Sequence, residues 1–316
     1  MPSLTRVIKD VRALGTSAPL RAAYEASKRT NGHSLLFRPV PGGYRSTPLD
    51  VGHHLPTSEV ARGRCLADAR LIVDEGTRVF GTRAATGASV SWAMDPLTER
   101  CWPEDTPWWQ IDIRTDARLS DVKWVWEAAR HRDLVVLARA ATLEPDGPWL
   151  TQLEAMLVRW CRECRPEQGV NWYSSLELAL RAIAWSQVLR LVGDRLHGGL
   201  RAEIDDQLVA SARHIMVELP YTMTSMKNNH LLGDGLGLVV LGKLFPEHPS
   251  SRRWQAIGDR LMLKQLSRHM LPDGSMIEDS LSYHRFVLEM FIVRVLVGGA
   301  PSEITAAMRA SSEHLI

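Results

Sequence analysis

The sequence predicts a mainly helical protein built from antiparallel helical hairpins, and three observations carry this prediction. Apolar residues recur at helical spacing from residue 120 to the end of the chain. The connections between these periodic segments are short, and alternation of the β type is almost absent. Four prolines lie between the segments or at their starts, where proline is tolerated: Pro220, Pro246, Pro272 and Pro301. Such hairpins stack as a bundle, a superhelix or a closed α/α ring, and periodicity alone leaves these three arrangements open.

Residues 1–90 are expected to form an irregular, basic N-terminal segment. Residues 30–60 are rich in Gly, Pro, Ser and His, and residues 71–93 hold short apolar stretches broken by glycine, which indicates brief extended pieces. The segment carries 13 Lys and Arg against 7 Asp and Glu, although the whole chain has a net charge of only +2. An arginine-rich solvated surface explains this excess more simply than an anionic partner does.

Residues 91–316 are expected to form the helical domain, which opens with a loop dense in Pro and Trp at residues 96–107. Ser120 is the expected N-cap of a first helix that carries Val122, Val125, Trp126 and Ala129 at helical spacing. Seven further helices are expected at residues 149–164, 176–192, 201–219, 229–244, 251–271, 280–297 and 301–316.

Composition excludes several classes of protein. The near-neutral charge gives no field for nucleic acid, and no apolar run approaches the roughly 20 residues that span a bilayer. The first 20 residues lack the continuous apolar core of a secretory signal, so we expect a cytoplasmic protein, or a periplasmic or secreted one if the start is mis-assigned. Cys161 and Cys164 form a CxxC without a second pair, and the sequence indicates no metal site and no cofactor.

The chain is rich in tryptophan. Ten of its 11 Trp lie between Trp92 and Trp185. Most are expected to pack in the core, but the flat face of a Trp ring also suits stacking against a sugar.

Four short motifs follow one another along the chain. Residues 121–131 read DVKWVWEAARH, and residues 169–181 read GVNWYSSLELALR. Residues 227–232 read KNNHLL, and residues 272–284 read PDGSMIEDSLSYH. Together they resemble, in order, the signatures of the helical domain of heparinase II/III-type polysaccharide lyases. The resemblance covers roughly residues 90–300 and implies an α/α toroid, incomplete here.

The resemblance also implies an activity. The family cleaves uronic-acid polysaccharides, such as heparan sulfate, other glycosaminoglycans or alginate, by β-elimination. A base removes the proton at C5, the developing charge on the carboxylate is stabilised, and the leaving oxygen receives a proton. By resemblance Asn229 stabilises the carboxylate and Tyr283 protonates the leaving oxygen. His230 and His284 are further catalytic candidates, which bind saccharide or support their neighbours.

Several residues are candidates for binding an anionic polysaccharide or oligosaccharide. Trp124, Trp126 and Trp172 are candidates for stacking on sugars, against core packing as the alternative. Arg130 and Arg181 are candidates for contacting uronate, although the spacing Glu127–Arg130 and Glu177–Arg181 is typical of pairs that stabilise helices. Asn228 is a further candidate for binding the substrate, although Asn228 or Asn229 is also a natural N-cap for the following helix.

The chain departs from the family in one respect. The family carries a β-sandwich domain after the helical domain, and a His from that domain usually acts as the base, whereas this chain ends within a helical pattern. A glycan-binding fragment without catalysis is therefore the alternative function. A third interpretation is a glycoside hydrolase that uses Asp273 and Glu278, although Asp273-Gly274 is more naturally a turn.

Overall fold

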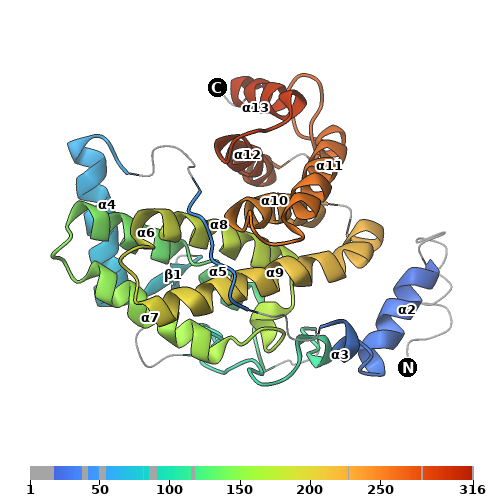
Figure 1. Ribbon diagram of the computed structural model, residues 1–316, viewed down its shortest axis with the longest axis horizontal. Coiled ribbons are helices and arrows are strands. Elements are labelled where there is room, and N and C mark those ends of the chain that lie inside the picture. The colour runs from blue at the N-terminus through green and yellow to red at the C-terminus, as the bar shows by residue number, and fades with distance from the viewer. Residues whose placement is uncertain are drawn as a thin grey trace.

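The computed structural model describes residues 18–37, 42–49, 55–80, 82–84, 91–114, 118–226, 228–278 and 280–314. Within them the chain is mainly helical, with two short strands (Figure 1). None of the described helices is both long and apolar enough to cross a membrane. Lys227 and Asp279, which belong to two of the motifs, lie outside the described residues, as do residues 1–17.

The N-terminal part of the chain contains helices that the sequence analysis did not expect. Helix α2 spans Ala18–Arg29, α3 spans His33–Leu36 and α4 spans Glu59–Glu75. A short antiparallel hairpin of β1 (Thr77–Val79) and β2 (Thr82–Ala84) follows, which agrees with the expected extended pieces. The prediction of a wholly irregular segment over residues 1–90 is therefore wrong.

Local signals explain where α4 begins and ends. The side chain of Ser58 accepts a hydrogen bond from the amide of Ala61 (3.2 Å), so it acts as the N-cap. The helix ends at Gly76, whose φ of 84° is costly for a residue with a side chain. The sequence analysis did not predict this helix, because the Gly- and Pro-rich segments around it indicate irregular structure.

Nine α-helices and two single-turn 3-10 helices make up the rest of the described fold. They are η2 (Trp108–Gln110), α5 (Lys123–Ala128), α6 (Arg132–Leu143), α7 (Trp149–Glu163), η3 (Val170–Trp172), α8 (Ser175–Val192), α9 (Gly198–Ser225), α10 (Asn229–Leu244), α11 (Ser251–His269), α12 (Leu281–Leu296) and α13 (Ser302–His314). The sequence analysis predicted α7, α8 and α10–α13 with small differences at their ends.

Two helices depart from the prediction. The first predicted helix starts at Lys123 rather than just after Ser120, because the amide of Ser120 donates to the carboxylate of Asp95 (2.5 Å) and is held in the loop. His131, with a φ of 59°, then separates α5 from α6. No helix was predicted at α6, where a run of four apolar residues suits a strand as well as a helix.

Helix α9 does not stop before Pro220 as predicted, but continues to Ser225. Proline removes one backbone hydrogen bond from a helix interior. Pro220 is exposed, and the side chain of Thr224 donates to its carbonyl (2.9 Å), so the last turn keeps a local bond. The helix therefore runs on almost to Asn229, the first residue of α10.

The helices form antiparallel hairpins in two layers (Figure 1). The inner layer holds α6, α8, α10 and α12, each in contact with the next, and the outer layer holds α7, α9, α11 and α13. The hairpins pair α6 with α7, α8 with α9, α10 with α11, and α12 with α13. In the N-terminal part α2 packs on α9, and α4 packs on α6, so both join the same body.

Glycines let α10 approach its neighbours closely. A Cβ built on Gly237 would lie 2.6 Å from the Cβ of Ala179 on α8, and one on Gly233 would lie 2.2 Å from Leu176. On the other side, a Cβ on Gly258 of α11 would lie 2.4 Å from the carbonyl oxygen of Gly235. Since the contacts with α8 advance together along both helices, α8 and α10 run parallel, with their first turns at the same end.

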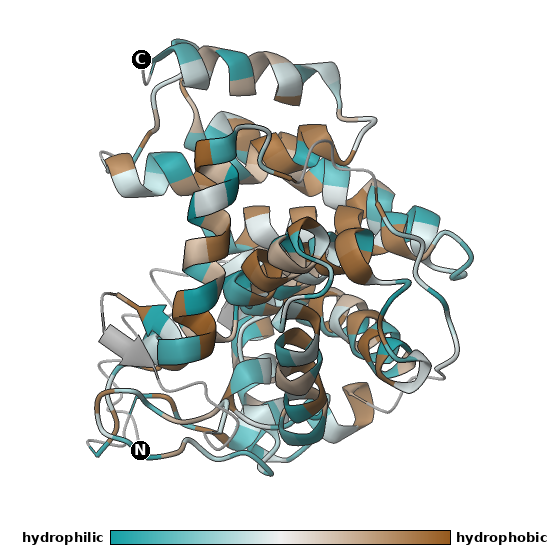
Figure 2. Cartoon of the chain, turned by 90° about the vertical axis from the view of Figure 1, so that its left-hand side faces the viewer, coloured by the Kyte–Doolittle hydropathy of each residue, from teal (hydrophilic) through white to brown (hydrophobic). Residues whose placement is uncertain are grey.

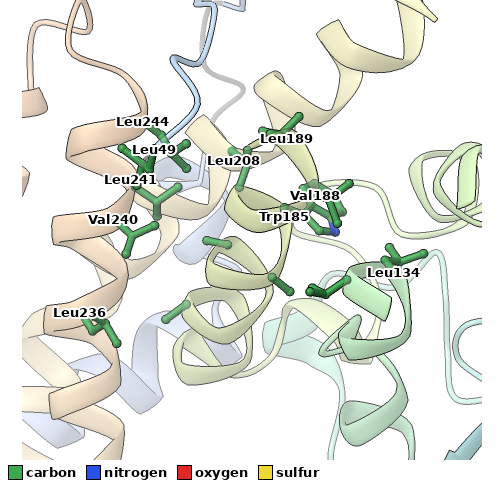
Figure 3. Packing of buried hydrophobic residues seen from close by; sticks show 14 of the residues in the cluster. Leu49, Leu134, Trp185, Val188, Leu189, Leu208, Leu236, Val240, Leu241 and Leu244 are labelled. Carbon is green, nitrogen blue, oxygen red and sulfur yellow. The ribbon is translucent and has the colours of Figure 1, made fainter. Parts of the chain in front are cut away.

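The hydrophobic core is continuous from α6 through α8 to α10 (Figure 3). Trp185 and Val188 of α8 occupy its middle, between Leu134 of α6 and Leu236 of α10. Figure 2 shows the same distribution, since long hydrophobic stretches lie on the central helices. Leu49, which belongs to no helix, is also buried against this core, and the amide of Thr47 donates to the last carbonyl of α10.

Candidate functional site

The start of α10 carries three of the predicted site residues. Asn228 is the N-cap, and its side-chain oxygen accepts a hydrogen bond from the amide of His230 (3.1 Å). Its role as a helix cap is therefore confirmed. Asn228 itself is exposed, whereas Asn229 and His230 are half-buried. The side-chain amide of Asn229 is thus available at the first turn of a helix, where backbone N–H groups have no partner within the helix.

His230 lies in a charged environment made by α5 and α8. Burial lowers the pKa of its imidazole; Glu177 opposes this shift, while Arg130 and Lys123 add to it. The imidazole is therefore mainly neutral at pH 7 and able to accept a proton. Because Glu177 belongs to the first turn of α8, the first turns of α8 and α10 lie together.

Arg130 is held in place by two carboxylates. Its Nε and Nη2 donate to the two oxygens of Glu177 at 2.8 and 2.9 Å, and its Nη1 donates to Glu127. Burial opposes the charge on Arg130, but the bonds to Glu177 and Glu127 outweigh it and raise the pKa of the guanidinium. About a fifth of the Arg130 side chain, 22%, remains exposed, so part of it can still meet a ligand.

Helix α12 begins at the same end of the molecule as α10. The imidazole of His269, at the end of α11, interacts with the backbone of Asn228 and with the charge of Glu278. The carbonyl of His269 accepts a hydrogen bond from the amide of Ile277 (2.9 Å) in the loop that leads into α12. This chain of contacts places the first turn of α12, which carries Tyr283, at the end where α8 and α10 begin.

Tyr283 and His284 face in different directions. Ser280 caps α12 by accepting a hydrogen bond from the amide of Tyr283 (3.5 Å), and the Tyr283 side chain is 48% exposed. His284 is buried, and its Nε2 lies 2.5 Å from the hydroxyl of Ser311 on α13. Neighbouring residues on a helix point about 100° apart, which explains the divergence. The assignment of His284 to catalysis is therefore corrected: it joins α12 to α13.

The three candidate tryptophans differ in exposure. Trp172 is fully buried and donates to the carbonyl of Cys164 (3.3 Å), and Trp126 is 9% exposed and donates to the carbonyl of Val170 (2.9 Å). No sugar ring can stack on the buried Trp172, so its substrate-binding assignment is corrected. Trp126 is largely core. Trp124 is half-buried and meets the ring of Phe80 edge-on at 5.0 Å, which leaves it as the candidate for a sugar.

Arg181 also belongs to the core. It is 3% exposed, its Nε donates to the carbonyl of Ala129 (3.0 Å), and its Nη2 donates to the carbonyl of Asn171 (3.1 Å). Burial lowers the pKa of its guanidinium to about 10. The expected pairing of Arg181 with Glu177 is wrong, because Glu177 pairs with Arg130, and the substrate-binding assignment of Arg181 is corrected as well.

Of the two carboxylates considered for a hydrolase, Asp273 forms a turn with the residues that follow it. Asp273 accepts hydrogen bonds from the amide and the hydroxyl of Ser275, at 2.9 and 2.7 Å, and Gly274 follows with a φ of 84°. This is the turn that the Asp-Gly sequence predicts. Those hydrogen bonds lower the pKa of Asp273, so it is a poor general acid.

The structure thus brings Asn228, Asn229, His230 and Arg130 together, with Tyr283 on the neighbouring α12. Sequence reasoning missed His269, which links Asn228 to the loop before α12, because nothing in the sequence pairs a helix-end His with a residue 41 positions earlier. Three helix N-termini at one end of the molecule favour a negatively charged ligand. Among the described residues no group of three or more His, Cys, Asp or Glu is placed to hold a metal ion.

Comparison with protein families gives one match. The model of the heparinase II/III N-terminus matches residues 86–300, which is more than half of the chain. No curated protein matches the chain.

Solved structures with a similar fold are heparinases. A heparinase III described as the BT4657 gene product is 14% identical with a TM-score of 0.53, and covers 99% of this chain. The heparan sulfate lyase HepC from Pedobacter heparinus is 18% identical with a TM-score of 0.53, and also covers 99% of this chain. This chain spans 46% of the length of each. The likeness confirms the predicted fold class, an all-α arrangement of the α/α toroid type.

Proposed function

This chain belongs to the heparinase II/III family, and we propose that it binds a uronic-acid-containing glycan, of the heparan sulfate or alginate kind, and takes part in its β-elimination. The observation that carries the proposal is the meeting of Asn229, His230 and Arg130 at the first turns of α8 and α10, with Tyr283 at the start of the adjacent α12. The family match and the printed function of one structural neighbour, a heparan sulfate lyase, support it.

Each side chain suits one step of the proposed reaction. Removal of the C5 proton leaves charge that spreads onto the carboxylate, and the amide N–H of Asn229 can donate to one of its oxygens. The C4–O bond then breaks, a C4–C5 double bond forms, and the phenol of Tyr283 gives its proton to the leaving oxygen. Arg130, which pairs with Glu177 beside the first turn of α8, keeps 22% of its side chain exposed, so it would offer the uronate hydrogen bonds rather than net charge.

The base must be neutral and within reach of C5. His284 does not meet this requirement, since it is buried against Ser311. Among the described residues near Asn229, His230 has an imidazole whose pKa is lowered, so it is free to accept a proton at pH 7. The family resemblance instead expects a His on a separate β-sandwich. If that domain supplies the base, residues 1–316 alone will show little turnover while still binding the glycan.

A second candidate function is glycan binding without catalysis, for which the half-buried Trp124 and the partly exposed Arg130 would be sufficient. The test of both is a panel of heparan sulfate, chondroitin sulfate and alginate. Elimination is followed by the ultraviolet absorbance of the unsaturated product, and binding by calorimetry. Absorbance shows a lyase, and binding without absorbance shows the second function. Reducing ends without absorbance would indicate hydrolysis, and a protein that neither binds nor cleaves any of them would refute both.

Variants assign the roles. We expect Asn229→Ala to weaken binding and elimination together, because the amide meets the carboxylate in both states. Tyr283→Phe should leave binding unchanged and abolish elimination, since only the phenolic proton is lost. Tyr44→Phe is the matched control, because the ring of Tyr44 lies beside that of His248 (centroids 4.5 Å apart, planes tilted by 57°), away from the candidate site residues. An active Tyr283→Phe protein would rule out Tyr283 as the acid.

A further inference from the structure

A hollow of about 450 Å³ opens between the four inner helices. Neither Asn229 nor Tyr283 lines it, although Arg130 does. Its walls are mainly apolar and come from α6, α8 and α12, through Val136, Leu180, Ile183, Phe286, Met290 and Val293. A volume of this size accommodates a small organic molecule.

Three arginines line this hollow, but two of them are already neutralised. Arg130 pairs with Glu177 and Glu127, and the guanidinium of Arg132 pairs with Glu127. Arg139 differs. Among the described residues its guanidinium has no carboxylate partner, and its one side-chain hydrogen bond is a long one to Gln187 (3.4 Å).

The guanidinium of Arg139 is also incompletely satisfied. Its Nε is buried and has no hydrogen-bond partner in the described part of the chain. A buried donor without a partner is costly, and a carboxylate can satisfy two guanidinium donors at once. Glu289 lines the hollow from α12, but it is exposed, so solvent screens its charge. The guanidinium of Arg139, a cation without a carboxylate partner in a mainly apolar hollow, is therefore complementary to a ligand with one anionic group and an apolar body.

We propose that this hollow is a binding site for a small organic anion with an apolar body, such as an aryl carboxylate, whose carboxylate pairs with Arg139. A polysaccharide does not suit it, because sugar hydroxyls need many polar partners and the walls at α8 and α12 offer mainly hydrocarbon. Neither Asn229 nor Tyr283 lines the hollow, so the site shares only Arg130 with the proposed glycan cleft, and the inference does not rest on the lyase assignment.

Two probes of nearly equal shape test the proposal. They are 2-naphthoate, which carries the carboxylate, and 2-naphthylmethanol, which does not. Equilibrium dialysis gives the affinity of each for the wild-type chain. We expect one molecule of naphthoate to bind per chain, at least about tenfold more tightly than the alcohol, since hydrogen bonds to charged groups are the stronger ones.

Variants then identify the cation. Arg139→Gln should lower the affinity for naphthoate to that for the alcohol, while the affinity for the alcohol stays the same. Arg190→Gln is the matched control and should leave both affinities unchanged, because Arg190 is an exposed arginine of α8 that does not line the hollow. Circular dichroism confirms that each variant is folded, and the comparison of the two probes on the wild-type chain needs no variant.

Three outcomes would overturn the proposal. They are no binding of naphthoate by the wild-type chain, equal affinities of the wild-type chain for the two probes, and a folded Arg139→Gln protein that still prefers naphthoate. Competition separates this site from the glycan cleft, because a heparan sulfate oligosaccharide should not displace naphthoate. Displacement would place the anion in the cleft and also refute the inference.

Discussion

Arg130 donates two hydrogen bonds of 2.8 and 2.9 Å to the carboxylate of Glu177, so the turn after α5 is connected to the first turn of α8. The two residues lie 47 positions apart and come from two different sequence motifs. Their pairing explains why both motifs hold a charged residue at these positions. It also brings a partly exposed cation to the first turn of α8, close to His230.

The first prediction concerns this pair. Arg130→Gln leaves the carboxylate of Glu177, which is 5% exposed, without its cation, so we expect the free energy of unfolding to fall by about 2 to 4 kcal/mol. Arg132→Gln removes an exposed arginine that also contacts Glu127, and should change it by less than about 1 kcal/mol. Urea unfolding followed by circular dichroism measures both. An equal fall in the free energy of unfolding for both variants would show that the bidentate pair of Arg130 and Glu177 is no more stabilising than the exposed pair of Arg132 and Glu127.

The second prediction separates the tryptophans. Trp172→Ala removes a fully buried side chain and should destabilise the chain by about 3 to 5 kcal/mol. Trp124→Ala removes a half-buried ring and should cost only about 1 kcal/mol, but it should weaken glycan binding if that ring faces sugar. Thermal unfolding and calorimetry with a heparan sulfate oligosaccharide give the two quantities. Unchanged binding by Trp124→Ala would remove Trp124 from the cleft.

The third prediction is a dependence of stability on pH. Burial raises the pKa of Asp234 to about 7, although the nearby hydroxyls of Ser175 and Thr222 oppose this shift. A free aspartate loses its proton near pH 4, so between the two values the folded chain binds more protons than the unfolded chain. The contribution of Asp234 to stability is therefore present at low pH and is lost as the pH rises through about 7.

Asp234→Asn isolates this effect, because asparagine is nearly the same shape and does not ionise. We expect the stability of the variant relative to the wild type to increase by roughly 3 kcal/mol between about pH 5 and pH 8. Urea titrations at several pH values provide the measurement. A difference that does not change with pH would show that Asp234 does not titrate in this range.

The fourth prediction concerns the attachment of α2. The ammonium of Lys28 lies over the rings of Trp108 and Tyr173, at 5.0 and 4.9 Å from their centroids. Lys28→Met keeps the apolar stem but removes the charge, so the cation–π attraction of about 0.5 to 2 kcal/mol is lost. We expect cleavage by subtilisin within residues 18–37 to become about 2- to 30-fold faster. Lys28→Arg, which keeps a cation, should be cleaved at nearly the wild-type rate, and equal rates for all three proteins would contradict this role.

Local sequence signals determined most of the helices and part of the site. Apolar spacing predicted α7, α8 and α10–α13, because each of these segments carries its own periodic signal. Asn228 could be recognised as a cap from its position, since capping involves only the next few residues. The four motifs also indicated the family. α4 and α6 were missed because nearby glycines and a short apolar run obscured the signal, and α9 continues through Pro220 because tertiary packing outweighs the loss of one hydrogen bond.

What only the tertiary structure decided is which side chains meet and which reach solvent. Trp124 and Trp172 look alike in sequence, yet one is half-buried and the other is enclosed, because exposure depends on elements distant along the chain. Arg181 has Glu177 four residues before it, the spacing of a helical ion pair. That carboxylate instead pairs with Arg130, which follows α5, and Arg181 donates a hydrogen bond to the backbone carbonyl of Ala129. Pair energies on a helix surface are only a few tenths of a kcal/mol, whereas leaving a buried charge unpaired costs several, so long-range packing chose the partners.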